Sequence, residues 1–380
     1  MIDLVFADES IVLRPTVVRV DIRALEHNFR MLRSLVGKTR VMATVKANAY
    51  GHGLVRTAQE FLRLGADELG VAFLEEGIVL RKAGVTAPIL VLGGIIGNQI
   101  AHFLEYDLQI TASSVLKIRQ IDETAAALGR RAQVHLKIDT GMGRIGVRPE
   151  SAPALFDAAV EAKHCDIRGV FTHFSASHAA DPGFTRMQLE RFLEATRYFE
   201  RHSLPMPLRH AANSAAVLQH PEAILDMVRP GIMLYGVYPS AETRRTVELR
   251  PALSFLTRVV YFKSIPAGAP LGYDHTWVAP VGTRIVTLPV GYGDGYSRKL
   301  SNNADVLIHG KRYPVVGMIS MDQCMVDIGG DSAFNGDEVV LIGRQGEECI
   351  TVEEIAERIG TIPYEVLTSI GHRVPREYIA

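Results

Sequence analysis

Eight strand-like runs, each followed by a segment of helical periodicity, occupy residues 39–236 and limit the possible folds of this chain. The runs cover residues 39–47, 67–73, 88–94, 108–113, 132–139, 165–175, 208–214 and 226–234. Short strand–helix–strand connections require parallel strands, and eight such units close into a barrel. The pattern predicts an α/β fold with an N-terminal (β/α)8 TIM-type barrel. A doubly wound open sheet is the competing interpretation.

The pattern changes after Gly236, where short alternating segments are separated by Gly, Pro, Asn and Asp. Such spacing is typical of an antiparallel β domain. With a boundary near residues 240–250, we expect the barrel over residues 14–240 and a C-terminal antiparallel β domain over residues 250–380, with residues 1–13 as a possible addition. Within this domain, Thr351 and Glu354 have capping-box spacing and predict a helix start.

Charge and cysteine content exclude several classes of protein. Lys and Arg number 41 against 42 Asp and Glu, a net charge of −1, which argues against a nucleic-acid or polybasic membrane surface. The three cysteines are far apart, so neither a disulfide framework nor a thiolate zinc site is expected. The N-terminus lacks a secretory pattern, and the longest apolar run is shorter than the ~20 residues of a membrane span. We expect a soluble, cytoplasmic protein.

Polar side chains stand at the ends of the predicted barrel strands, where barrels carry their chemistry. In chain order these are Lys46, Lys137, Asp139, Arg144, His173, His210, Asn213, Ser214 and Arg229. Burying such groups without partners costs several kcal/mol each. We therefore expect them to face a shared polar ligand.

Lys46 is the sharpest candidate for chemistry. A lysine that emerges from a buried strand has a lowered pKa and a nucleophilic amine, although a lone lysine is more often salt-bridged or extended to solvent. Ser214 and the Gly231–Ile232 pair occupy the place where barrels bind phosphate, although Gly and Ser also simply form turns. A reactive lysine with a phosphate cradle suggests pyridoxal phosphate held as a Schiff base.

Arg229 would then face the pyridine nitrogen, if it is not a structural arginine that caps a helix. A guanidinium donates hydrogen bonds but does not hand over a proton, so the cofactor would be a weak electron sink, suited to proton exchange at Cα.

His173 taken alone is more typical of a core histidine, and the GYGDG run at 291–295 indicates a turn. No zinc-protease, paired Cys/His or nucleophile-elbow motif supports metal catalysis or serine hydrolysis.

Eight motifs in order, VKANAYGHG, KIDTGMGRIG, THFS, HAANSAA, RPGIMLYG, GYDHTW, LPVGYGDGY and GMISMDQCMVDIG, closely resemble those of alanine racemase. The resemblance runs from about Arg14 to Arg376. It implies a barrel joined to a β domain, a head-to-tail homodimer and pyridoxal phosphate as cofactor. It also implies a cytoplasmic isomerase that supplies D-alanine for peptidoglycan.

The resemblance assigns two bases. Lys46 corresponds to the Schiff-base lysine, which acts on D-alanine, and Tyr273 to the opposing base for L-alanine, supplied by the partner subunit. Racemisation removes the Cα proton on one face and returns one on the other, so two opposed bases suit it. A tyrosine has an ordinary pKa near 10 and needs help to lose its proton, which a Tyr273–His173–Arg229 network would give.

The resemblance also assigns the binding residues. Phosphate contacts correspond to Tyr50, Ser214, Gly231 and Ile232, the pyridine contact to Arg229, and the substrate carboxylate contacts to Arg144 and the Met321 backbone, with Met321 and Asp322 contributed by the partner. His173 corresponds to a histidine near the ring and His210 to a residue behind the arginine. Lys137 corresponds to a lysine that is carbamylated in some members and braces the arginine equivalent to Arg144.

Three positions depart from the family pattern: Ser320 stands where many members have a cysteine, and Phe171 and His372 each stand where some members have a tyrosine. These changes leave open a broader serine/alanine racemase. A decarboxylase on the same architecture is disfavoured by Arg229 and Ser320. A non-catalytic regulatory protein that binds pyridoxal phosphate is disfavoured by the β domain with its Tyr273.

Overall fold

The computed structural model describes residues 13–380, so the suggested pairing of residues 1–13 with the β domain lies, apart from residue 13, outside the described residues. The chain forms two compact units. The barrel unit comprises Leu25–Ala49 and Gly53–Arg250. The β unit comprises residues 13–24, Tyr50–His52 and Pro251–Ala380.

The barrel unit is built on eight parallel strands in the order β8-β7-β6-β5-β4-β3-β2-β9. Their bounds are β2 (Arg40–Thr44), β3 (Glu68–Val71), β4 (Ile89–Val91), β5 (Gln109–Ala112), β6 (Ala132–Lys137), β7 (Cys165–Phe171), β8 (Leu208–His210) and β9 (Met227–Val228). The N–H groups of Asp226 and Arg229 donate to the carbonyls of Arg209 and Ala212, at 3.1 and 2.9 Å. These bonds join β9 to β8 and close the circle. The predicted (β/α)8 barrel is confirmed, and the open-sheet interpretation is wrong.

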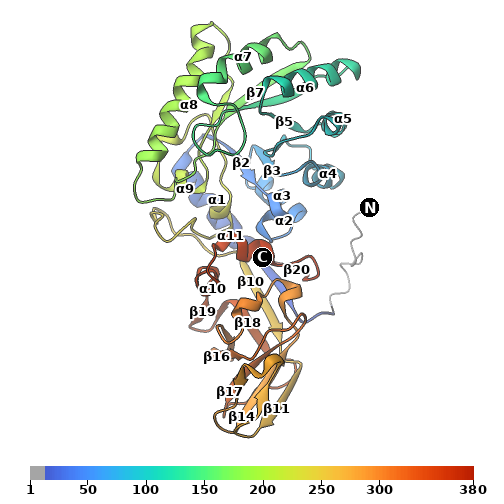
Figure 1. The fold of residues 1–380 in the computed structure, drawn as a ribbon, viewed down its shortest axis with the longest axis vertical. Coiled ribbons are helices and arrows are strands. Elements are labelled where there is room, and N and C mark those ends of the chain that lie inside the picture. The colour runs from blue at the N-terminus through green and yellow to red at the C-terminus, as the bar shows by residue number, and fades with distance from the viewer. Residues whose placement is uncertain (1–12) are drawn as a thin grey trace. The chain divides into compact units, whose positions relative to one another are not determined.

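Helices surround these strands (Figure 1). They are α1 (Ile22–Val36), α3 (Leu54–Arg63), α4 (Leu74–Lys82), α5 (Ile100–Glu105), α6 (Val115–Ala127), α7 (Ala152–Glu161), α8 (Gly183–Arg201) and α9 (Ser214–Gln219), with 3-10 turns at Gly97–Gln99, Pro149–Ser151, Pro221–Ala223 and Ile232–Tyr235. In α8, Leu189, Phe192 and Phe199 are buried while Glu190 and Glu194 are exposed. This helical spacing of apolar residues explains why α8 lies on the barrel with one face.

The β unit is a mainly antiparallel sheet in the order β11-β14-β17-β16-β15-β18-β10-β1-β20, with β19 beside β18 and a separate β12–β13 hairpin. The strands are β1 (Val17–Asp21), β10 (Leu253–Arg258), β11 (Tyr261–Ile265), β12 (Pro270–Leu271), β13 (Trp277–Val278), β14 (Thr283–Leu288), β15 (Asp305–Ile308), β16 (Lys311–Val316), β17 (Cys324–Gly329), β18 (Glu338–Gln345), β19 (Glu348–Ile350) and β20 (Arg376–Ile379). Among the strands of the β unit within residues 13–380, only β1 and β20 pair in parallel. The predicted C-terminal β domain is therefore confirmed.

The N-terminal boundary of the barrel differs from the prediction, and Tyr50–His52 belong to the β unit although we expect them in the barrel. We placed residues from 14 onward in the barrel, but β1 pairs with β10 and β20 in the β unit, and the barrel unit begins at Leu25. The reason is that Val17, Val18 and Val20 are buried in this sheet, where β1 covers the edges of two other strands. An apolar strand at the N-terminus carries no mark of which later strands it will pair with.

The helices of the β unit are α10 (Val352–Ile359) and α11 (Pro363–Ser369), with 3-10 turns at Tyr273–His275, Tyr292–Asp294 and Arg298–Leu300. The hydroxyl of Thr351 accepts the N–H of Glu354 at 3.1 Å, which confirms the predicted helix start. No helix within residues 13–380 has both the length and the apolar character needed to cross a membrane.

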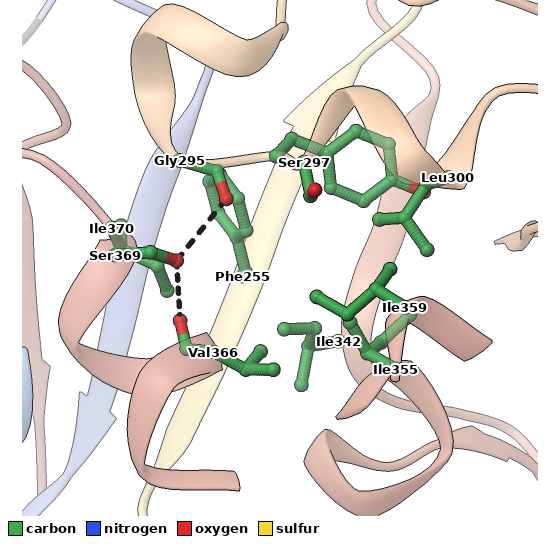
Figure 2. Close-up of a pocket in the computed structure, with 11 residues that line it drawn as sticks. Phe255, Gly295, Ser297, Leu300, Ile342, Ile355, Ile359, Val366, Ser369 and Ile370 are labelled. Atoms are coloured by element: carbon green, nitrogen blue, oxygen red, sulfur yellow. Dashed lines mark hydrogen bonds between the residues drawn. The ribbon is translucent and has the colours of Figure 1, made fainter. Parts of the chain in front are cut away.

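The β unit contains a small cavity of about 20 Å³, enough for one water molecule. Figure 2 shows the residues that line it. Its walls include Phe255, Ile342 and Val366, and Ser369 closes one side by donating its hydroxyl to the Gly295 and Val366 carbonyls. Tyr296 also lines the cavity and is only 2% exposed. Its hydroxyl has no hydrogen-bond partner within residues 13–380, and burial raises its pKa well above 10.

We expect Tyr296→Phe to unfold at the same temperature as the parent protein or at a higher one, because the substitution removes a buried hydroxyl that no protein group satisfies. Tyr198→Phe is the matched control, since the Tyr198 hydroxyl donates to the Asp157 carboxylate, and losing that bond should cost about 1–3 kcal/mol. Thermal unfolding of both variants checks this. A clear loss of stability in Tyr296→Phe would contradict it.

Candidate active site

The predicted residues of the barrel unit gather at the carboxyl end of its strands. Lys46 follows β2, Lys137 ends β6, His173 follows β7, His210 ends β8 and Arg229 follows β9. The carboxyl ends of the strands in a parallel barrel lie on one face. The structure therefore brings these side chains to the same end of the barrel.

A left-handed turn follows Lys46 directly. Ala47, Asn48, Ala49 and Tyr50 have φ between 52° and 55°. This conformation costs roughly 1–2 kcal/mol for each residue that has a Cβ. Two side chains hold the turn: Glu76 accepts the N–H of Ala47 at 2.6 Å, and Asn48 accepts the N–H of Leu54 at 2.8 Å. Strain of this kind persists where the surrounding structure imposes it, often at functional sites.

The pKa of the Lys46 amine is shifted in the direction that favours its neutral form. Burial lowers its pKa from the ordinary 10.5, the positive charges of Arg144 and Arg229 lower it further, and Glu76 opposes them. This is the direction expected from the sequence. Glu76, which the sequence analysis missed, therefore contacts the turn after Lys46 and also acts on the lysine through its charge.

Arg229 is only 5% exposed, and its guanidinium is almost fully engaged by the protein. Nη1 donates to His210 Nδ1 at 2.9 Å and to the His210 carbonyl at 2.6 Å. Nη2 donates to the carbonyls of Thr172 and Ala211, at 2.6 and 3.3 Å. A guanidinium has five N–H groups, so Nε–H is the one donor that no group of residues 13–380 engages. Burial lowers the pKa of Arg229 to about 9, which leaves it charged at neutral pH.

Phe171 lies between the charged groups of this end of the barrel. Its ring stacks on His210, with centroids 4.9 Å apart and an angle of 6° between the planes. Arg229 Cζ lies 5.2 Å from the ring centroid, and Lys137 Nζ lies 4.7 Å from it. Burial, together with Arg229, lowers the pKa of Lys137 well below 10.5. The Lys137 amine is therefore a buried group that contacts no compensating carboxylate within residues 13–380.

His173 and Arg144 lack the set of hydrogen bonds that fixes Arg229 within residues 13–380. Burial and the charge of Arg229 lower the pKa of His173 well below 6.5. None of the four Arg229 hydrogen bonds goes to His173, so the described chain does not contain the direct His173–Arg229 link that we expected. Arg144 is exposed in the loop after β6, where Asp139 accepts three backbone N–H groups and fixes the loop.

The predicted phosphate residues belong to both units: three to the barrel unit and one to the β unit. Ser214 Oγ accepts the N–H of Gly231 at 2.8 Å, and Ile232, which follows Gly231, opens the 3-10 turn after β9. These three residues of the barrel unit are thus brought together. Tyr50 belongs to the β unit, where its ring lies 6.1 Å from that of Tyr364, centroid to centroid.

In the β unit, Tyr273 and Met321 lie on exposed loops. Tyr273 is 67% exposed and follows Gly272, whose φ of 73° favours glycine. Met321 is 52% exposed, and its carbonyl accepts the N–H of Gly293 at 2.9 Å. The neighbouring Asp322 accepts a hydrogen bond from Arg373 at 2.5 Å.

The GYGDG run forms a turn, as predicted, but it also positions the Met321 loop. A Cβ on Gly291 would lie 2.2 Å from the Ser320 carbonyl oxygen, so only glycine allows this approach. Asp294 is fully buried and pairs with Arg14 at 2.7 Å and with Arg373 at 2.8 Å. The high density of glycine was the available signal for this packing, and we interpreted it as a turn alone.

We expect Ala47→Gly to raise the free energy of unfolding by roughly 0.5–1 kcal/mol, because glycine adopts φ near 53° without strain. The same substitution at Ala195, in the middle of the right-handed helix α8, should instead lower it by about 1 kcal/mol. Denaturant unfolding of the two variants checks the difference in sign. Equal losses at both positions would mean that the turn carries no releasable strain.

Comparison with known proteins identifies the family. The family model described as "Alanine racemase, N-terminal domain" matches residues 20–239, and that described as "Alanine racemase, C-terminal domain" matches residues 252–378. "Alanine racemase 2" of Caldanaerobacter subterraneus subsp. tengcongensis is 41% identical over 370 residues, which cover 97% of this chain and 95% of that protein.

Solved structures agree with this. The crystal structure of alanine racemase from Bacillus anthracis with bound L-Ala-P has a TM-score of 0.93 and 36% identity, covering 98% of this chain and 96% of the other. Histidine racemase from Leuconostoc mesenteroides subsp. sake has a TM-score of 0.91 and 28% identity, covering 98% and 100%. With both domain models and nearly the whole length matched, this chain belongs to the alanine racemase family.

Proposed function

We propose that this protein interconverts L- and D-alanine with pyridoxal phosphate. The observation that carries the proposal is the pairing, at one end of the barrel, of a lysine with a lowered pKa and an arginine with one uncommitted donor. Membership of the family and the substrate named for its relatives give this pairing its chemical meaning.

The residues present fit the cofactor. Lys46 would attach the cofactor through its neutral amine, and the Nε–H of Arg229 would donate a hydrogen bond to the ring nitrogen. Ser214, Gly231, Ile232 and Tyr50 would hold the phosphate. When bound, pyridoxal phosphate withdraws electrons from the substrate Cα and so acidifies its C–H bond. Because a guanidinium does not give up its proton to the ring, Arg229 limits this withdrawal to what a proton exchange needs.

Two bases from different subunits would move the proton. The Lys46 amine takes or returns it on one face of the substrate, and Tyr273 of the partner subunit does so on the other. The exposure of Tyr273 supports this assignment, since a side chain 67% exposed is available to a second copy of the chain. We therefore propose a homodimer whose sites are each completed by the partner.

Arg144 would bind the substrate carboxylate, with the backbone of the partner subunit's Met321. The Arg144 side chain makes no hydrogen bond or ion pair within residues 13–380 and so is available for a carboxylate. The neutral amine of Lys137 is the form that adds carbon dioxide; the resulting carbamate, formed with release of one proton, would brace Arg144 as an anion.

A broader substrate range is the second candidate, and the observation that favours it is the histidine racemase with the same fold. Phe171 adds weight, since its ring leaves the pocket without the hydroxyl that a tyrosine would supply. We favour alanine because relatives at 41% identity carry that name. A cytoplasmic location and a role in supplying D-alanine for peptidoglycan remain predictions from the family resemblance.

We expect the purified protein with pyridoxal phosphate to convert L-alanine to the racemate, and to act more slowly on L-serine and other L-amino acids, as measured by chiral chromatography. Lys46→Ala should lose the activity and the borohydride-reducible absorbance of the bound cofactor. Lys38→Ala, a lysine before β2, is the matched control and should keep both. Cofactor binding without turnover of any amino acid would instead support a regulatory protein.

Mixing two inactive variants tests the shared site. Lys46→Ala and Tyr273→Phe chains, co-expressed with different tags, should regain about one quarter of the wild-type sites at random pairing, because each heterodimer has one intact site. Tyr261→Phe, another exposed tyrosine of the β unit, should be active on its own. No recovery in purified heterodimers would rule out the division of the bases between subunits.

A further inference from the structure

A chain of hydrogen bonds continues from Arg229 through the barrel. His210 Nε2 lies 2.9 Å from His135 Nδ1, and His135 Nε2 lies 3.0 Å from Gln109 Oε1. Gln109 then donates to Gln133 at 3.4 Å. Gln133 donates to Asp107, also at 3.4 Å. His135, His210 and Gln109 are all buried, and no role for His135 or Gln109 follows from the mechanism above.

Arg229 fixes which atom donates and which accepts in every hydrogen bond of this series. Arginine has no acceptor, so His210 Nδ1 must accept and the proton of His210 must sit on Nε2. That N–H requires His135 Nδ1 to accept, and so the His135 proton also sits on Nε2. Gln109 must then present its oxygen to His135. All donors point away from Arg229 and toward the carboxylate of Asp107.

Gly169 leaves the space that the His135 ring occupies in this series of hydrogen bonds. His135 on β6 is paired with Gly169 on β7, and a Cβ at Gly169 would lie 2.5 Å from His135 Nδ1. The missing side chain lets the His135 ring cross β7 to reach His210 on β8, where the rings meet edge to face at 5.1 Å. A relay over three neighbouring strands is therefore built into the sheet.

The chain also runs along the barrel from end to end. Gln133, His135 and Lys137 alternate on β6 and share one face. Arg229 lies at the carboxyl end of the strands, and Asp107 precedes β5 at their amino end and is exposed. Water can replace the last acceptor at that surface, but it cannot reach the two histidines.

We propose that His135 and Gln109 are positioning residues for Arg229: they hold His210 in the tautomer whose Nδ1 accepts from the guanidinium, and so keep Nε–H as its one uncommitted donor. If His210 carried its proton on Nδ1, two N–H groups would face each other and the guanidinium would have to turn. The consequence for the cofactor rests on the proposed function, whereas the tautomers do not.

The tautomers are tested directly by neutron diffraction from crystals of the perdeuterated full-length protein with pyridoxal phosphate. We expect deuterium on Nε2 and none on Nδ1 of both His135 and His210. Deuterium on Nδ1 of either residue would overturn the proposal. Because this measurement uses the unaltered protein, it stands even if a variant fails to fold, or if the proposed activity is absent.

The positioning role is tested by two substitutions of Gln109. Gln109→Met keeps the length of the side chain but removes the acceptor, and should weaken pyridoxal phosphate binding about tenfold, the scale of one buried donor left unpaired. Gln109→Glu presents an oxygen to His135 in either charge state and should bind within about twofold of the parent. Asp107→Ala, at the solvent end, should also bind normally. Cofactor affinity is measured by equilibrium titration of the apoprotein.

Each outcome decides the matter. Weak binding by Gln109→Met with recovery in Gln109→Glu supports a directed chain, because general damage to the core would not be repaired by an acceptor. Equal affinity in all three variants, or equal loss in Gln109→Met and Gln109→Glu, overturns the positioning role. If the parent protein itself fails to bind pyridoxal phosphate, the proposed function fails, and the neutron result alone then decides the tautomers.

Discussion

The buried charge of Arg229 is the interaction on which the rest of the site depends. No carboxylate pairs with it within residues 13–380; instead, the carbonyls of Thr172, His210 and Ala211 and one histidine nitrogen receive its four Nη hydrogen bonds. Burying a charge without such partners is prohibitive. The charge can stay buried because β7 and β8 end together and direct the carbonyls of Thr172, His210 and Ala211 toward the arginine that follows β9.

This positive charge adds to the effect of burial on the protonation of its neighbours. The pKa values of Lys46, Lys137 and His173 are all lowered first by burial and then by positive groups that include Arg229. Burial, with Arg229 as a further cause, thus shifts two amines and an imidazole at the same end of the barrel toward their neutral forms. A neutral amine is what both nucleophilic attachment and proton removal require, so the electrostatics of the barrel and the proposed chemistry agree.

Much of the fold could be predicted because its signals are local. The eight barrel strands alternate with helices in the sequence itself, and Lys46, His210 and Arg229 stand at strand ends that the fold must bring together. The pairing of β1 with β10 and β20 could not be predicted, because partner choice depends on distant residues. The left-handed turn at Ala47–Tyr50 could not be predicted for another reason: the side chains of Glu76 and Asn48 support it through contacts that exist only in the folded state. The sequence does not distinguish His135 and Gln109 from other strand residues, because the space that Gly169 leaves for the histidine exists only in the folded sheet.

Two properties of the guanidinium explain why an arginine serves this position. Its lack of acceptors forces the direction of the hydrogen bonds through His210 and His135, which a carboxylate or an amide at residue 229 would leave free to reverse. Its pKa, although lowered to about 9 by burial, stays above neutrality, so it keeps its proton when it faces a basic ring nitrogen. An acidic residue at the same place would exchange a proton with the ring and with the histidine behind it. The same side chain would therefore limit electron withdrawal by the cofactor and fix the direction of the hydrogen bonds inside the barrel.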